Sequence, residues 1–170
     1  QASSSAASDV YKRQIQYRYG YRPISLLSFA LDIELSEMTP KTGHVMNVLH
    51  YALLCCLIFY FLRRMFPEKG ALFSILVVGL FLIHPVHTEV VANIKSRDEI
   101  LAMTFGVASL IFLLNFLEKS KNNFLHAGLM ILMLVLSFLS KESGITFVGV
   151  LVVVASVSYT HLRAHETASD

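Results

Sequence analysis

A series of apolar runs separated by short polar stretches places the strongest limit on how this chain can fold. The runs cover residues 45–62, 71–83, 100–117, 124–139 and 144–155. A membrane-spanning helix needs about 20 mostly apolar residues, and a shorter run such as residues 71–83 fits a short or tilted span. Only 15% of the 170 residues are charged, whereas about a quarter are charged in soluble proteins. The sequence therefore predicts an all-α, polytopic membrane helix bundle with about five spans.

Upstream of the first run, residues 23–38 have the pattern of an amphipathic helix. Pro23 suits the first position of a helix, because its missing N–H would have no partner there. Apolar residues then recur at every third or fourth position, at Ile24, Leu27, Leu31, Leu35 and Met38. The segment is shorter than a span and carries acidic residues, including Asp32, so we expect it to lie in the membrane interface. A helix packed in a soluble-type core is the alternative.

A small-residue face in the third run predicts close helix packing. Ala102, Gly106 and Ser109 follow one another at spacings of four and three. Such a face lets another helix approach closely, so we expect ordinary packing there.

The charge and the cysteine content exclude two classes of protein. The formal net charge is only +2 and no block of Lys and Arg with interleaved aromatic residues occurs in the sequence, which excludes a nucleic-acid partner. The two cysteines, Cys55 and Cys56, are adjacent within an apolar run, so they form neither a disulfide framework nor a zinc ribbon.

The two ends of the chain differ from its apolar middle. Residues 1–14 and 157–170 resemble translated adapter sequence, and we assign both as non-native tails that flank a partial membrane domain, residues 15–156. The chain starts with Gln1 and shows no signal peptide, so we interpret it as a fragment.

Basic residues near the ends of the runs predict the orientation in the membrane, because cytoplasmic loops are enriched in Lys and Arg. Residues 63–70 hold Arg63, Arg64 and Lys69, and residues 118–123 hold Lys119 and Lys121. Both connections are therefore expected to be cytoplasmic. Residues 84–99 and 140–143 then lie on the external or lumenal face together with the amphipathic helix, so polar groups from three segments are predicted to converge there.

Residues 84–99 gather two His, three acids, a Lys and an Arg between two apolar runs, and we interpret them as a loop at the membrane surface. Ionisable groups at a membrane edge are energetically costly, so such a cluster indicates a functional site. His84, His87 and Glu89 have a spacing that would suit metal ligands on a helix. Zinc sites need more ligands and the HExxH motif is absent, so we expect no divalent metal and no cofactor. Two alternatives remain: a neutral His that hydrogen-bonds a backbone carbonyl at a helix end, and contact with a polar substrate.

The end of the same stretch predicts an anion site. Four charged residues lie where the third apolar run begins: Lys95, Arg97, Asp98 and Glu99. The helix dipole stabilises each acid in a first turn by about 0.3–1 kcal/mol, which accounts for the acids but not for the bases. A helix N-terminus with adjacent Lys and Arg suits a phosphate, and Arg22 and Lys141 could complete the site. A lipid-linked phosphate lies at the right depth in the membrane to bind there.

Five short motifs, in order along the chain, resemble one family. They are YRPISLLSF at residues 21–29, GHVMNVLH at 43–50, HPVHTEVVA at 84–92, RDEIL at 97–101 and KESGIT at 141–146. They resemble the membrane half of TMTC-type proteins, which are polytopic glycosyltransferases of the GT-C class with tetratricopeptide repeats behind the membrane domain. The amino-acid sequence of residues 92–99 resembles that of bacterial relatives more than that of animal ones.

The resemblance implies transfer of a sugar, mannose in the characterised animal branch, from a polyprenyl-phosphate donor to a protein hydroxyl on the external or lumenal face. It implies a location in the bacterial inner membrane or the endoplasmic reticulum. The catalytic acid of this class lies in the first external loop, expected upstream of Tyr17, so the fragment alone is expected to be inactive. The positions that carry over as binding or pocket residues are Arg22, His84, His87, Glu89, Arg97, Asp98, Glu99, Lys141 and Glu142.

Two other functions remain open. A transporter or channel segment would need ionisable residues deep within its spans, and charges are almost absent from the apolar runs. A lipid-packed scaffold without chemistry is the other alternative, and the confinement of charge to one face argues against it.

Overall fold

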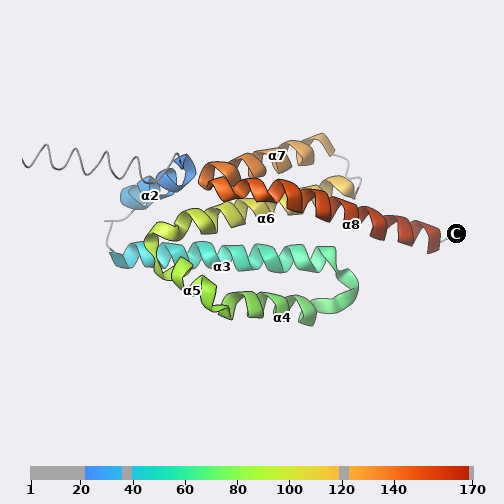
Figure 1. Ribbon diagram of the computed structural model, residues 1–170, viewed down its shortest axis with the longest axis horizontal. Coiled ribbons are helices and arrows are strands. Elements are labelled where there is room, and N and C mark those ends of the chain that lie inside the picture. The colour runs from blue at the N-terminus through green and yellow to red at the C-terminus, as the bar shows by residue number, and fades with distance from the viewer. Residues whose placement is uncertain (1–21, 36–39, 119–122, 169–170) are drawn as a thin grey trace, which may run out of the picture.

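The structure, a computed structural model, describes residues 22–35, 40–118 and 123–168 (Figure 1). Within these ranges the chain forms helices and short turns, without a strand. The α-helices are α2 (Pro23–Leu35), α3 (Pro40–Met65), α4 (Gly70–Ile83), α5 (Pro85–Ala92), α6 (Arg97–Leu117), α7 (Asn123–Ser140) and α8 (Thr146–Ala168). Short 3-10 helices join several of them: η1 (Pro67–Lys69), η2 (Ile94–Ser96) and η3 (Glu142–Ile145). The predicted all-α class is confirmed.

Four helical segments are long and apolar enough to cross a membrane: Gly43–Met65, Ile94–Leu117, Asn123–Ser140 and Glu142–Thr160. They correspond to the first, third, fourth and fifth apolar runs. The second run forms α4, which reaches spanning length only together with α5, across a bend of 63°. The described residues therefore hold four candidate spans, or five if the bent pair crosses as one, and the predicted polytopic bundle is confirmed.

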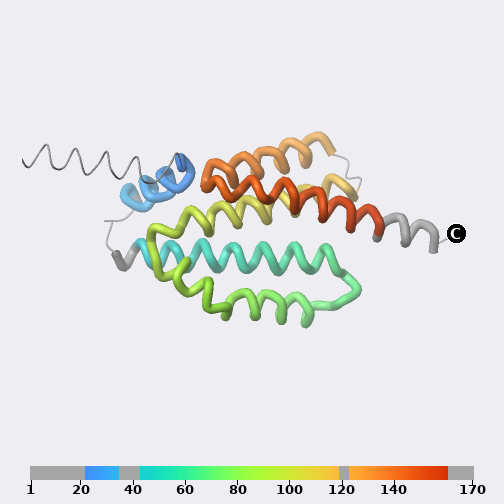
Figure 2. The backbone as a smooth tube through the Cα atoms, viewed as in Figure 1, coloured from blue at the N-terminus to red at the C-terminus, as the bar shows by residue number. Residues whose placement is uncertain are grey.

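The central helix of the bundle is α6. It lies between α3 on one side and α7 and α8 on the other, and α4 packs against α3 away from α6 (Figure 1). The backbone trace shows the same order, with α2 at the end of the bundle where α6 begins (Figure 2). The spanning window of α6 is 61% buried, against 22% for α3 and 11% for α7. Large apolar side chains on the outer helices remain exposed, as expected for surfaces that face lipid.

The small-residue face of α6 packs against two helices. A Cβ atom at Gly106 would lie 2.3 Å from the Phe147 ring of α8. Ser109 is fully buried, and the Ser137 hydroxyl of α7 donates a hydrogen bond of 2.7 Å to the carbonyl oxygen of Ala102. These contacts confirm the predicted role of this face in close helix packing.

Residues 84–99, which we expected to form a loop, are largely helical. Pro85 occupies the first turn of α5, and Nδ1 of His84 accepts a hydrogen bond of 3.3 Å from the Val86 N–H. The extended backbone of His84 separates α4 from α5. The prediction of a loop was wrong, because a proline that ends one helix also suits the first position of the next.

The polar side of α2 faces the protein. Ser25 and Asp32 are buried, at 5% and 6% exposed. The Ser25 hydroxyl donates a hydrogen bond of 3.2 Å to the carbonyl oxygen of Ser140 at the end of α7. Four apolar side chains point outward and are more than half exposed: Leu26, Leu27, Leu31 and Ile33. An outward apolar face suits a helix that lies against lipid, although its place in the interface stays a prediction, and residues 36–38 lie outside the described part of the chain.

Candidate functional site

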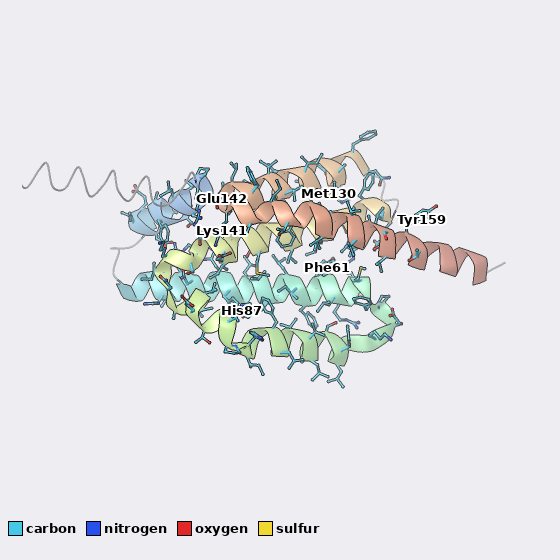
Figure 3. The ribbon with its side chains drawn as sticks, viewed as in Figure 1. Phe61, His87, Met130, Lys141, Glu142 and Tyr159 are labelled. Atoms are coloured by element: carbon cyan, nitrogen blue, oxygen red, sulfur yellow. The ribbon has the colours of Figure 1, made fainter. Side chains whose placement is uncertain are left out.

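The charged residues that the sequence singled out meet at one end of the bundle. Three segments contribute: the residue before α2, the first turn of α6 and the junction of α7 with η3. Lys141 and Glu142 lie at this junction, on the side of the bundle next to α2 (Figure 3). The predicted convergence of polar groups from three segments is confirmed. Which side of the membrane this end faces stays a prediction.

Arg22 connects all three segments. Its guanidinium pairs through Nη1 with Asp98 in α6, and Nη2 lies 3.1 Å from Oε2 of Glu142 in η3. The Asp98 side chain is 8% exposed, whereas that of Glu142 is 63% exposed. The Nε atom of Arg22 is buried and has no hydrogen-bond partner among the described residues. Arg22 therefore pairs with one buried and one accessible carboxylate. Its Nε–H group is a donor that no described residue accepts from.

Lys141 forms a further ion pair of the site, with Glu99 in the first turn of α6. Its backbone is extended, with φ −158° and ψ 147°, because α7 has ended and η3 has not yet begun. Gly144 allows the chain to turn tightly here, since a Cβ atom would lie 2.5 Å from the backbone carbonyl of Ser137. The turn therefore packs directly on the α7 backbone, which holds the Lys141 side chain toward α6.

Arg97 lies deeper than the other cations of the site and is 0% exposed. Its Nε donates to Oδ1 of Asn47 (2.9 Å), its Nη2 lies 3.3 Å from the carbonyl oxygen of Gly43, and its Nη1 pairs with Asp32 of α2. The guanidinium carbon lies 4.3 Å from the centre of the Phe29 ring, in cation–π range. These contacts tie α2, α3 and α6 together. We predicted that Arg97 would bind phosphate, and that role stays untested.

Sequence reasoning missed Asp32 and Asn47 as partners in this cluster. Asn47 is 0% exposed and also donates a hydrogen bond of 3.1 Å to the carbonyl oxygen of Asn93. The available signal was the lone amide within an otherwise apolar run, because a polar residue at depth in a membrane needs a partner. Asp32 gave a weaker signal, since it belongs to a helix that already carries several polar residues.

The remaining predicted residues lie apart from the charge cluster. His87 is across α3 from Lys141 and Glu142 (Figure 3), and its ring packs 4.1 Å from the Phe81 ring between centres. His84 is exposed and caps α5. Glu89 lines an open depression of about 450 Å³ with His44, Ala92, Asn93 and Ile94. Lys95 is exposed in η2, which Asn93 caps by accepting a 3.1 Å hydrogen bond from the Lys95 backbone N–H.

The histidines and acids of this region do not form a metal centre. In the part of the chain that the structure describes, no group of three or more His, Cys, Asp and Glu side chains is placed to hold a metal ion. The helical spacing of His84, His87 and Glu89 therefore does not gather three ligands. His84 does lie at a helix end, but its ring accepts a hydrogen bond from the Val86 N–H, whereas the helix-end alternative expected a bond to a backbone carbonyl.

Helix content, span number and a charge cluster at one end together define a multi-pass membrane protein with a polar site at the end of its bundle. The sequence matches the family described as dolichyl-phosphate-mannose-protein mannosyltransferase over residues 26–167. The chain belongs to this family, which confirms the family that its motifs suggested.

Three relatives illustrate the likeness. The chain is 34% identical to the mouse protein O-mannosyl-transferase TMTC3 over 76% of the chain and 14% of that protein. It is 35% identical to mouse protein O-mannosyl-transferase TMTC1 over 83% of the chain and 16% of that protein. It is 31% identical to the Caenorhabditis elegans protein O-mannosyl-transferase F38B6.6 over 85% of the chain and 20% of that protein. The chain thus spans a fifth or less of the length of these relatives, and no solved structure matches it.

The proposed domain boundaries stay predictions. Residues 1–14 lie outside the described part of the chain. The backbone of α8 continues from the span through residue 157 as far as Ala168.

Proposed function

We propose that this chain is the donor-facing part of a membrane glycosyltransferase that transfers mannose from a polyprenyl-phosphate donor to a protein hydroxyl. The relatives are named as protein O-mannosyl-transferases, which supports mannose and a protein acceptor. The reaction would take place on the external or lumenal face, where we place the charge cluster. Membership of the family is the general support, and the cluster around Arg22 is the observation that carries the proposal for this chain.

The cluster has the chemistry that an anionic lipid head group requires. Arg22 and Lys141 are 21% and 22% exposed, so both cations are reachable from the bundle end yet shielded from bulk water. A guanidinium binds phosphate oxygens in the same forked geometry in which it binds carboxylates. The helix that follows Arg22, α2, exposes apolar residues that suit a polyprenyl chain.

We assign the roles within the site by exposure. Arg22 and Lys141 would contact the donor phosphate, whereas the exposed Lys95 lies in η2, apart from them. The buried Arg97 would support them by fixing the start of α6. Asp98 and Glu99 would form polar walls toward the sugar or the acceptor, whereas His84, His87 and Glu89 lie apart from this cluster. The resemblance places the catalytic acid upstream of Tyr17, outside the residues that the structure describes.

The donor dependence of transfer tests this function. In the full-length protein, Arg22→Ala and Lys141→Ala should each raise the donor KM by about 10- to 100-fold, because one charge-assisted hydrogen bond contributes about 1.5–3 kcal/mol. Arg64→Ala is the matched control, since Arg64 pairs with Glu118 at the opposite end of the bundle. Its donor KM should match that of the parent protein. An unchanged donor KM in both site variants would contradict the proposal.

A further inference from the structure

We propose that Glu142 stands in for the donor phosphate when no donor is bound: its carboxylate occupies the outer side of Arg22 and is exchanged for the phosphate on binding. The inference rests on the proposed function, because it takes a lipid-linked phosphate as the ligand of Arg22. It adds a residue that sets donor affinity without contacting the donor.

The two carboxylates on Arg22 differ in how firmly they are held. Asp98 is nearly buried in the first turn of α6, and its Oδ1 also accepts a hydrogen bond of 2.8 Å from the Glu99 backbone N–H. Glu142 is 63% exposed and lies 3.1 Å from Arg22 Nη2. An exposed ion pair contributes little to stability, whereas removal of a buried partner leaves a charge unpaired. The Glu142 contact is therefore the one that can open at low cost.

Arg22 already holds two carboxylates, which favours exchange over addition. Among the described residues, Asp98 occupies Nη1 of Arg22 and Glu142 occupies Nη2. A phosphate that simply added to Arg22 would lie next to the like charge of Glu142. If the phosphate replaces the Glu142 carboxylate, Arg22 keeps one outer anion and its buried pair with Asp98 is undisturbed.

The geometry at Arg22 suits a phosphate better than it suits the present carboxylate. Glu142 engages Nη2, while the buried Nε has no hydrogen-bond partner among the described residues. Phosphate offers three acceptor oxygens and is bound by Arg through two parallel N–H donors. Glu99 is the less suitable candidate for exchange, because it is 39% exposed and lies in the helix turn where the dipole stabilises an acid.

The test measures binding of polyprenyl phosphate to the full-length protein in phosphatidylcholine nanodiscs, with the donor KM for mannose transfer as a second readout. Glu142→Gln removes the competing charge and keeps the side-chain shape. Both the dissociation constant and the donor KM should fall by about two- to fivefold, the range expected from loss of an exposed ion pair. Inorganic phosphate, titrated in parallel, should bind more weakly because it lacks the lipid chain, and tighter binding of inorganic phosphate would overturn the assignment of a lipid ligand.

Glu118→Gln is the matched control, because Glu118 is an exposed partner of an arginine, Arg64, at the other end of the bundle. It changes the net charge equally and should leave both readouts unchanged. An unchanged or higher dissociation constant in Glu142→Gln, or an equal fall in Glu118→Gln, would overturn the exchange. If Arg22→Ala still raises the donor KM in those cases, the proposed function holds without the exchange. If polyprenyl phosphate binds as expected but no mannose is transferred, the exchange stands and the proposed function fails.

Discussion

Arg97 is the residue on which the local structure of the site depends most. It is fully buried, and its partners come from α2 and from the first turns of α3. Desolvation of a guanidinium is costly, and the cost is offset only when the group is paired and hydrogen-bonded on all sides. The described contacts of Arg97 satisfy all three of its nitrogen atoms.

Replacement of Arg97 should therefore act through stability. Arg97→Ala removes the Arg97 side of a buried ion pair with Asp32, and the free energy of unfolding should fall by about 3–5 kcal/mol. The measurement is a denaturant titration of the protein in mixed micelles. Arg64→Ala, which breaks a pair with a half-exposed partner, should cost about 1 kcal/mol or less. Equal stability losses in the two variants would contradict the stabilising role of the buried Arg97 contacts.

The sequence indicated that Arg97 matters but not why. A Lys or Arg at a helix N-terminus is compatible with a bound phosphate and equally with an internal carboxylate. The choice depends on whether Asp32, 65 positions away, packs its helix onto α6. No pattern within either segment carries that information. Lys141 was easier to place, because it follows the apolar run at residues 124–139, and Arg22 because Pro23 marks the start of a helix.

At the scale of the helices, close packing between α6 and α8 depends on a single glycine. Gly106 is buried in the middle of α6, where glycine lowers helix propensity relative to alanine. Its position against the ring of Phe147 explains why a side chain is excluded there.

Gly106→Ala should destabilise the bundle. The new Cβ atom would lie 2.3 Å from the Phe147 ring, and overpacking of this kind costs about 1–3 kcal/mol. The free energy of unfolding in mixed micelles measures the effect. Gly79→Ala in α4 is the control, because nothing lies within 4 Å of its Cβ position and alanine favours the helix. A stability equal to that of Gly79→Ala would show that α8 does not pack on α6 in this way.

Apolar run length predicted the helices well and their ends less well. The run at residues 100–117 became α6, which starts three residues earlier at Arg97 because the charged residues form its first turn. The wrong prediction of a loop at residues 84–99 has a similar cause. An apolar run indicates a segment buried in lipid, whereas α5 begins where it does because of Pro85 and the cap at His84. A charged segment can thus be helical without any apolar signal.

At the scale of the whole molecule, the two ends of the bundle carry different charge arrangements. One end holds the cluster of Arg22, Lys141 and their acids, and the other holds Arg63 and Arg64 with Glu118. The α3 helix runs from the first end to the second (Figure 1). The density of Lys and Arg predicts that the second end is cytoplasmic.

Single-cysteine labelling tests this orientation. In a background with Cys55→Ser and Cys56→Ser, a membrane-impermeant maleimide should label Ser143→Cys from the external or lumenal side. Glu68→Cys should react only from the cytoplasmic side. Both positions are exposed, so access to the reagent depends on the membrane alone. The reverse labelling pattern would place the charge cluster in the cytoplasm and contradict an external reaction.

The central claim is that the end of the bundle around Arg22 binds the phosphate of a lipid-linked sugar. The structure of the full-length protein with a non-hydrolysable mannosyl polyprenyl-phosphate analogue tests it most directly. Our account predicts phosphate oxygens at about 2.7–2.9 Å from the Arg22 guanidinium and the Lys141 ammonium group, with the Glu142 carboxylate displaced from Arg22. A phosphate bound at the Arg64 end, or one that leaves Arg22 and Lys141 on their present carboxylates, would contradict it.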